Sequence, residues 1–278
     1  MSIQWFPGHM TKARKVIADA LPNHDVIVEV VDARMPRASE NPMLGELCAH
    51  KARVLVLNKS DLADPVATEA WMKHYEQRSA ASSVPRVPIA ISTKKTADVR
   101  SRLPELCKKL TPRSSEKSVR VMIVGIPNVG KSTLLNTLLG RSVAKVGNEP
   151  AVTKAKQQVV LSNGITLSDH PGLMWPKIAR EEDAFKLALG GAIADNALEY
   201  ESLGLFAVGL FSKRYPKALL DRYKLDALGT NADETLRAIG KKRGCLEKGG
   251  IVNLMKAGDI VVHDFRNGAL GRITVELP

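Results

Sequence analysis

The sequence has few of the residues on which several classes of protein depend. Its 278 residues include three cysteines, and aromatic residues make up 4% of the chain. The number of cysteines is odd, and the spacing of Cys48, Cys107 and Cys245 is not that of metal ligands. We therefore expect neither a disulfide framework nor a zinc site. The aromatic residues are too few for a base-stacking platform. Any contact with nucleic acid should therefore be to phosphates or in a groove.

Long apolar stretches are also missing. The chain has no apolar run of about 18 residues and no cleavable signal sequence at its N-terminus. Residues 11–21 are amphipathic and basic, as in a mitochondrial transit sequence, but Asp19 and the Trp-Phe-Pro-Gly-His sequence at 5–9 argue against one. We therefore expect a cytoplasmic protein, not bound to a membrane, whose mature chain starts at or near Met1.

Acidic residues are outnumbered, and the formal net charge is +12. Residues 1–177 carry 26 Lys and Arg against 15 Asp and Glu, whereas residues 178–278 carry 15 against 14. The basic excess lies in the first of these segments, notably from Lys94 to Arg120. The positive electrostatic potential of such a segment favours the binding of polyanions such as RNA. A cationic surface that only keeps the protein soluble is the alternative.

A phosphate-binding pattern lies in the middle of the chain. Residues 125–132 read Gly-Ile-Pro-Asn-Val-Gly-Lys-Ser, between an expected strand at 119–124 and an expected helix at 132–139. Backbone N–H groups and the helix N-terminus would meet the phosphates. Lys131 would reach the β- and γ-phosphates, and the hydroxyl of Ser132 would ligate Mg²⁺. The candidate GTP-binding residues of this loop are Asn128, Val129, Gly130, Lys131, Ser132 and Thr133.

A guanine-reading pattern comes about seventy residues before the phosphate loop. Residues 58–61 read Asn-Lys-Ser-Asp and follow the β-like run 53–57, so they lie at the carboxyl end of a strand. Asp61 can accept hydrogen bonds from N1–H and the exocyclic amine of guanine, whereas adenine has no donor at N1. The pattern predicts a guanine nucleotide bound by Asn58, Lys59 and Asp61. Ser92 and Thr93 could form a second base-contacting loop.

Three further positions complete the expected nucleotide site. Asp169-His-Pro-Gly172 ends an expected β-hairpin over residues 157–169. Asp169 would hold Mg²⁺ through water, and the N–H of Gly172 would sense the γ-phosphate. Thr153, between the phosphate loop and this motif, is the candidate switch threonine that closes on Mg²⁺.

The order of these motifs is inverted, because in an ordinary GTPase the phosphate loop comes first. The elements expected to precede the guanine motif are present, as helix-like segments 11–21 and 40–50 and the strand-like segment 25–31. The old chain ends would be fused in the polar connector 111–118. We predict a doubly wound α/β P-loop GTPase domain over residues 1–177 that is circularly permuted.

Residues 178–278 have a helical pattern and no acid–base or metal constellation. The helix-like segments are 181–198, 199–214, 218–228, 233–242 and 250–267. Lys241-Lys-Arg243 and Arg266 could contact RNA or only solubilise a face. We expect a small all-helical C-terminal domain.

The hydrolytic machinery is incomplete in the sequence. Leu173 follows Gly172, where Ras-like enzymes have a glutamine that orients the attacking water. His9 is the candidate replacement, because the expected helix 11–21 takes the place of the switch II helix and its leading end should lie near the γ-phosphate. A loop or capping role for His9 stays open. Asn128 could ligate K⁺ in the absence of an arginine finger, or could hold the loop's own backbone.

The chain resembles the YlqF/RbgA family of circularly permuted GTPases that act in assembly of the large ribosomal subunit. The motifs that carry the resemblance are Trp5-Phe-Pro-Gly-His-Met10, Asp32-Ala-Arg-Met-Pro36, Asn58-Lys-Ser-Asp61, Gly125–Ser132, Asp169-His-Pro-Gly172 and Lys242-Arg-Gly244. The sequence departs from the family pattern at Ala151, where a glycine is expected, and at His170, where a threonine is usual.

The resemblance implies a GTPase that is slow alone and stimulated by large (50S) ribosomal subunits. The protein would bind ribosomal RNA in its GTP form, partly through the C-terminal domain, and leave after hydrolysis. Its cofactors would be Mg²⁺ and, through Asn128, K⁺. We expect a monomer whose nucleotide partners are GTP and GDP. Two alternatives remain: a GTPase in RNA modification or translation, and a nucleotide-gated RNA-binding module with negligible hydrolysis, which Leu173 would permit.

Overall fold

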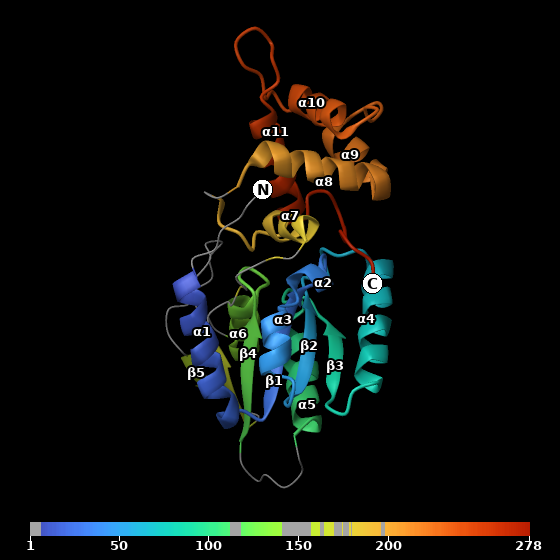
Figure 1. The fold of residues 1–278 in the computed structure, drawn as a ribbon. Helices are drawn as coiled ribbons and strands as arrows, with labels where there is room; N and C mark the ends of the chain where they lie inside the picture. The colour runs from blue at the N-terminus through green and yellow to red at the C-terminus, as the bar shows by residue number, and fades with distance from the viewer. Residues whose placement is uncertain are drawn as a thin grey trace.

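The structure is a computed structural model of the chain. It describes residues 7–111, 118–140, 157–161, 164–169, 174, 178, 180–195 and 198–278, with the backbone alone for residues 7–13, 157–158 and 169. A part built on a β-sheet lies beneath a part built of helices, and the chain's last residues run down beside the sheet part (Figure 1).

The sheet has six strands in the order β3-β2-β1-β4-β6-β5. Their bounds are β1 Val26–Asp32, β2 Ala52–Asn58, β3 Arg86–Ala90, β4 Val119–Gly125, β5 Gln157–Val160 and β6 Ile165–Asp169. All neighbours are parallel except β5 and β6, which form the expected antiparallel hairpin. Every residue of β1 is buried, which is typical of a central parallel strand covered on both faces.

Helices cover both faces of the sheet, because alternate residues of a strand point to opposite sides. The helices of the sheet part are α1 Pro7–Ala20, α2 Pro36–Ser39, α3 Pro42–Leu47, α4 Pro65–Ala80, α5 Thr96–Lys109 and α6 Lys131–Leu139, with the short 3₁₀ helix η1 Leu21–Asn23. On one face Ile27 packs with Ile17 of α1 and Leu44 of α3. On the other face the neighbouring residue Val28 packs with residues of α5 and α6. The predicted doubly wound fold is confirmed.

Two helix boundaries differ from those expected. Helix α1 begins at Pro7 instead of residue 11, because proline suits the first position of a helix, where its missing N–H has no intrahelical partner. His9 therefore lies inside α1, and its expected position in a loop before the helix is wrong. The segment 40–50 contains only the short helix α3, whose N-terminus is capped when Asn41 accepts a hydrogen bond from the N–H of Met43.

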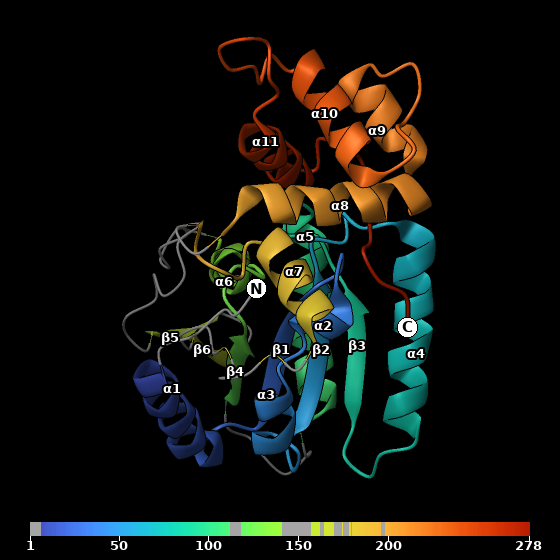
Figure 2. The ribbon, with the colours of Figure 1, turned by 45° about the horizontal axis from the view of Figure 1, so that its top comes forward.

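The upper part contains five helices among the residues that the structure describes. They are α7 Glu181–Leu189, α8 Tyr200–Arg214, α9 Pro216–Tyr223, α10 Ala232–Lys242 and α11 Leu254–Asn267 (Figure 2). Helices α8 and α11 approach closely at two glycines, since a Cβ on Gly204 would lie 2.5 Å from the Cα of Gly258. Glycine has no side chain to prevent this approach.

The predicted helical pattern of this part is confirmed, with shorter helices than expected. Helix α7 ends at Leu189 and not at 198, because Gly190 follows it and Gly191 takes a left-handed conformation with φ +81°. Helix α11 starts at Leu254 and not at 250, because Gly250 has φ +75° and Asn253 caps the helix.

The end of the chain returns to the sheet part. The N–H of Ile273 donates to the carbonyl of Leu62 at 3.0 Å, and that of Val275 donates to the carbonyl of Arg34 at 2.7 Å. The indole N–H of Trp71, on α4, donates to the carbonyl of Glu276 at 3.1 Å. The last residues therefore pack on the sheet part, and the division of the chain at residue 177 stays a prediction.

None of the helices in the described part of the chain combines the length and the apolar character needed to cross a membrane.

Candidate functional site

The predicted nucleotide motifs lie at one edge of the sheet. The phosphate loop follows β4, and the guanine motif starts at the last residue of β2. Strand β1 separates these two strands and runs parallel to both, with Val30 in register with Gly125 and Asp32 in register with Asn58. The carboxyl ends of parallel strands meet at the same edge, which is where open α/β sheets bind ligands. The inverted chain order thus gives a contiguous site.

The phosphate loop has the backbone conformation that its glycines permit. Gly130, with φ +96°, immediately precedes the first residue of α6, and Asn128 is also left-handed, with φ +60°. The ammonium of Lys131 curls back over the loop and donates to the carbonyl of Ile126 at 2.7 Å. Val129 is buried, and Ser132 and Thr133 are the next residues of α6. The loop therefore turns its backbone around the N-terminus of a helix, as phosphate binding requires.

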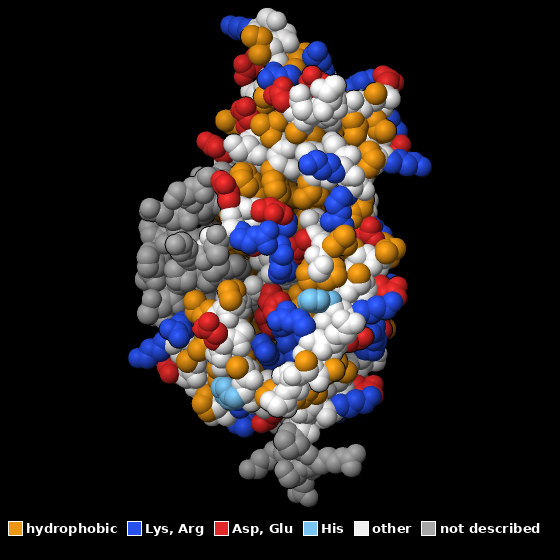
Figure 3. Space-filling view, turned by 45° about the vertical axis from the view of Figure 1, so that its right-hand side comes forward, with side chains coloured by type: hydrophobic (Ala, Val, Ile, Leu, Met, Phe, Trp, Pro, Cys, Tyr) orange, Lys and Arg blue, Asp and Glu red, His pale blue; other side chains and the backbone are white. Residues whose placement is uncertain are grey.

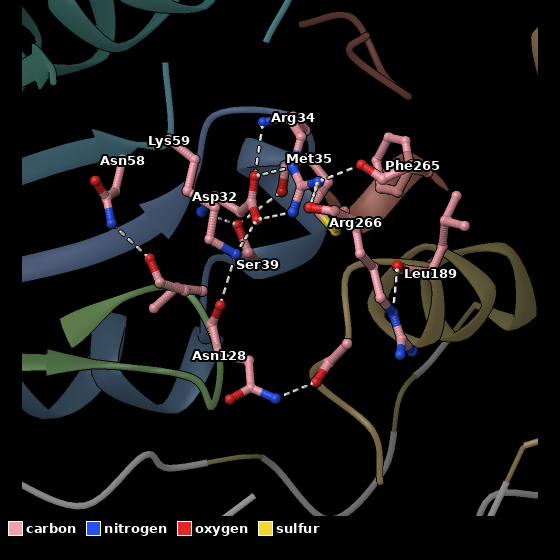
Figure 4. A network of polar contacts seen from close by, with 12 residues as sticks. Asp32, Arg34, Met35, Ser39, Asn58, Lys59, Asn128, Leu189, Phe265 and Arg266 are labelled. Atoms are coloured by element: carbon pink, nitrogen blue, oxygen red, sulfur yellow. Dashed lines mark hydrogen bonds and ion pairs between the residues drawn. The ribbon is translucent and has the colours of Figure 1, made fainter. Parts of the chain in front are cut away.

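The guanine motif is hydrogen-bonded directly to the phosphate loop (Figure 4). The side-chain amide of Asn58 donates to the carbonyl of Val129 at 2.8 Å, and the ammonium of Lys59 donates to the carbonyl of Asn128 at 2.7 Å. A Cβ on Gly130 would overlap the Asn58 amide, so this junction requires glycine. The Oδ1 of Asn58 is buried and has no hydrogen-bond partner in the described structure. Such an atom is available to a ligand.

The expected second base loop lies beside the guanine motif. The N–H of Ser60 donates to the carbonyl of Ile91 at 3.0 Å, and the ammonium of Lys94 lies 2.8 Å from the carboxylate of Asp61. Burial alone would raise the pKa of Asp61, but hydrogen bonds from Lys94 and Ser92 outweigh it and lower the pKa. Asp61 is therefore an ionised acceptor, and Ser92 and Thr93 are in the adjoining loop.

Two magnesium-ligand candidates lie at the same edge of the sheet. Ser132 is the second residue of α6, and Asp169 is the last residue of β6, in register with Ile123 of β4. A hydroxyl and a carboxylate are oxygen ligands of the kind that Mg²⁺ prefers, so the residue types and their placement fit this ion. The remaining expectations, namely Thr153, Gly172 and the side chains of His9 and Asp169, lie outside the described residues.

Asn128, the candidate K⁺ ligand, contacts the helical part. Its side-chain amide donates to the carbonyl of Gly191 at 2.6 Å, in the loop after α7. The sequence offered no signal for this contact, because Gly191 is 63 residues away and belongs to the other predicted domain. The phosphate loop is thus linked to both the guanine motif and the helical part.

A hollow lies away from these motifs, between α2, α4 and α7. Acidic and basic side chains adjoin one another on this face (Figure 3), and Arg37, Glu40, Arg78 and Asp183 line the hollow. Arg37 is 3.3 Å from Asp183, and Arg78 is 3.7 Å from Glu40. Because the charges are paired, this hollow has no evident surplus charge for a polyanion, and the nucleotide edge remains the candidate site.

A doubly wound sheet, a phosphate loop and a guanine motif joined in inverted chain order define a circularly permuted P-loop GTPase. Comparison with known proteins agrees. A family profile described as "50S ribosome-binding GTPase" matches residues 120–206. "Ribosome biogenesis GTPase A" of Bacillus cereus is 38% identical, over 100% of this chain and 95% of its own. The protein of the same name from Thermotoga maritima is 32% identical, over 99% and 95%.

A solved structure extends the likeness to the arrangement of the chain in space. GDP-bound YlqF of Thermotoga maritima matches with a TM-score of 0.68 and 28% identity, covering 95% of this chain and 99% of that one. The chain belongs to the ribosome biogenesis GTPase A family, YlqF/RbgA, and the resemblance seen in the sequence is confirmed. Its enzymatic activity is the hydrolysis of GTP.

Proposed function

We propose that this GTPase assists assembly of the large (50S) ribosomal subunit. It associates with ribosomal RNA in its GTP form and leaves after hydrolysis. The observation that carries the proposal is the junction of the guanine motif with the phosphate loop, directly beneath the helical part. It occurs in a chain whose whole length matches proteins named for ribosome biogenesis. The protein acts as a cytoplasmic monomer.

In this proposal each part of the site has a separate task. Asp61 reads the guanine edge, while Asn58 and Lys59 brace the loop beneath the base, beside Ser92 and Thr93. The phosphate loop, from Asn128 to Thr133, surrounds the phosphates with N–H groups, and Lys131 moves from the carbonyl of Ile126 to the β- and γ-phosphates. The N–H of Gly172 senses the γ-phosphate.

Ser132, Thr153 and Asp169 would hold Mg²⁺. When bound, this ion would offset the negative charge that develops during phosphoryl transfer. Asn128 would ligate K⁺ and thereby supply further positive charge. The side-chain NH₂ of Asn128 donates to the carbonyl of Gly191, so the ligand of the ion would be the other atom of the amide, Oδ1.

His9 would orient the attacking water. It is the third residue of α1, and the proposal takes this helix as the counterpart of the switch II helix in an unpermuted GTPase. A residue that only positions water lowers the rate when it is removed, with little loss of ground-state binding.

Exposed basic residues support contact with RNA. Lys241 and Lys242 are exposed at the end of α10. Arg266 is different: it donates to the carbonyl of Leu189 at 3.2 Å and pairs with Asp195 at 2.8 Å, which favours a structural role. RNA contact through lysines would be to phosphates and would weaken as salt rises.

Sedimentation with purified ribosomal particles tests the proposal. With a non-hydrolysable GTP analogue the wild-type protein should pellet with large subunits and not with small ones, and GDP should release it. Lys131→Ala is the control, since it removes the phosphate contact and should abolish the nucleotide dependence. Binding that is equal on large subunits and assembled ribosomes would favour a GTPase of translation instead. Absence of binding to every particle would refute the ribosomal role.

A further inference from the structure

A buried carboxylate joins the guanine motif to the helical part. Asp32, the last residue of β1, uses both of its oxygens (Figure 4). Its Oδ2 accepts hydrogen bonds from the ammonium of Lys59 at 2.9 Å and from Nη2 of Arg34 at 2.8 Å. Its Oδ1 accepts from the backbone N–H and the Nε of Arg34, both at 3.0 Å. Arg34 thus fixes the plane of the carboxylate that holds Lys59.

The Nη1 end of the Arg34 guanidinium contacts α11. Its Nη1 donates to the carbonyls of Phe265 at 3.0 Å and Arg266 at 3.3 Å, in the last turn of that helix. Its central carbon also lies 4.5 Å from the centre of the Phe265 ring, within the range of a cation–π interaction. A cation is favourable at the C-terminus of a helix, where carbonyls lack intrahelical partners. Arg34 therefore holds Asp32 and α11 at the same time.

The chain of contacts ends in the nucleotide site. Lys59 is left-handed, with φ +58°, and its ammonium is shared between Asp32 and the carbonyl of Asn128 in the phosphate loop. Each hydrogen bond in this chain of contacts from α11 to the phosphate loop involves a charged group and is 3.3 Å or shorter. Such hydrogen bonds are the strong ones in proteins.

The buried charges cannot separate without a large cost. Burial alone would raise the pKa of Asp32, but the charges of Arg34 and Lys59 outweigh it and hold the pKa well below its ordinary range. The carboxylate is therefore ionised. If α11 moved, Arg34 would have to release either Asp32 or the carbonyls of α11, leaving a buried polar group without its partner. The position of α11 and that of Lys59 are thereby tied.

We propose that Arg34 is a positioning residue that acts through Asp32 on Lys59 and so couples guanine-nucleotide affinity to the packing of α11. This inference rests on the proposed role of residues 58–61 as the guanine motif, and it makes no assumption about the ribosome. Because coupling between two sites is reciprocal, nucleotide binding must tighten α11 as much as α11 tightens nucleotide binding.

Nucleotide affinity gives the first test. In the full-length protein, Arg34→Met keeps an apolar stem over Phe265 and removes the donors to Asp32 and α11. GDP affinity should fall about tenfold or more, as expected for coupling between sites. Arg86→Met is the matched control, because Arg86 is also a buried arginine that pairs with carboxylates, Glu29 at 3.0 Å and Glu40 at 2.8 Å, but it is the first residue of β3, at the opposite end of the strand from the guanine motif. This control should bind GDP like the wild type.

Hydrogen exchange gives a readout that a merely structural arginine would not change. In the wild-type protein GDP should slow amide exchange in α11, residues 254–267, whereas in Arg34→Met saturating GDP should leave that rate unchanged. Arg86→Met should keep the GDP effect. If α11 of the wild type exchanges equally with and without GDP, the coupling is refuted, and this result does not depend on the folding of any variant.

A third variant separates this proposal from the site on which it rests. Asp61→Asn should weaken GDP binding because it changes the group that reads the base. If Asp61→Asn binds weakly while Arg34→Met binds like Arg86→Met, the coupling is wrong and the guanine motif stands. If Asp61→Asn binds GDP like the wild type, the guanine motif and the coupling both fall.

Discussion

Gly130→Ala tests the junction between the guanine motif and the phosphate loop. Gly130 has φ +96°, and a Cβ there would overlap the side-chain amide of Asn58, which donates to the carbonyl of Val129. The substitution therefore has two costs. A left-handed alanine costs about 1–2 kcal/mol, and leaving the buried carbonyl of Val129 without its partner costs about 1–3 kcal/mol. We expect a loss of unfolding free energy of roughly 2–5 kcal/mol.

Gly249→Ala is the control that has the backbone cost alone. The difference between the two variants therefore measures the cost of the lost hydrogen bond. Gly249 has φ +84°, close to that of Gly130, and nothing lies within 4 Å of its missing Cβ. It should lose only the backbone cost of about 1–2 kcal/mol and bind GTP like the wild type. Urea unfolding and fluorescence titration with a labelled GTP would measure both variants. If Gly130→Ala and Gly249→Ala were equal in stability and in affinity, Asn58 would not join the two motifs as described.

Three further substitutions address the base, a buried charge and the chemistry. Asp61→Asn should weaken GTP binding by several kcal/mol and permit xanthosine triphosphate, because an amide presents a donor where the carboxylate accepted; a competition titration measures this. Asp32 has a lowered pKa in the folded protein, so the stability from its charge is complete above its unfolded pKa of about 3.9 and is lost as pH falls through the folded pKa. The stability difference between wild type and Asp32→Asn in urea should therefore be constant near neutral pH and shrink below about pH 4. His9→Ala should abolish stimulated GTP turnover with little change in GTP affinity.

Each of these predictions has an outcome that contradicts it. Asp61→Asn that binds GTP with unchanged affinity would remove the guanine assignment. The stability difference between the wild type and Asp32→Asn could instead be as large at pH 3 as at neutral pH. Loss of the ionised carboxylate would then not explain the difference. Equal stimulated rates for His9→Ala and the wild type would leave His9 as a residue of α1 without a catalytic task.

The sheet and its ligand edge could be predicted because they depend on local patterns. Buried parallel strands are continuous apolar runs, as in residues 26–31, and the phosphate loop is a single segment that begins at Gly125 and ends in α6. The inverted motif order then restricted the topology further, because each element had to precede or follow a known strand. The sheet of the structure, with helices packed on both faces, is the doubly wound fold that was expected.

The links to the helical part could not be predicted, because they join residues far apart in the chain. Arg34 and Phe265 are 231 positions apart, and no periodicity marks them as partners. The contact of the last residues with the sheet part could not be predicted either. The N–H of Val275 donates to the carbonyl of Arg34, and such a backbone hydrogen bond does not depend on the pattern of side chains. The start of α1 at Pro7 was missed for a local reason, since Pro-Gly reads as a loop while proline is also acceptable at the first helical position.

GTP turnover in the presence of purified ribosomal subunits tests the central claim most directly. We predict that wild-type protein hydrolyses GTP slowly alone and faster with large subunits, that small subunits have no effect, and that stimulation falls as salt rises because phosphate contacts weaken. An unchanged rate with large subunits, at low salt and with saturating GTP, would contradict the proposed role in their assembly.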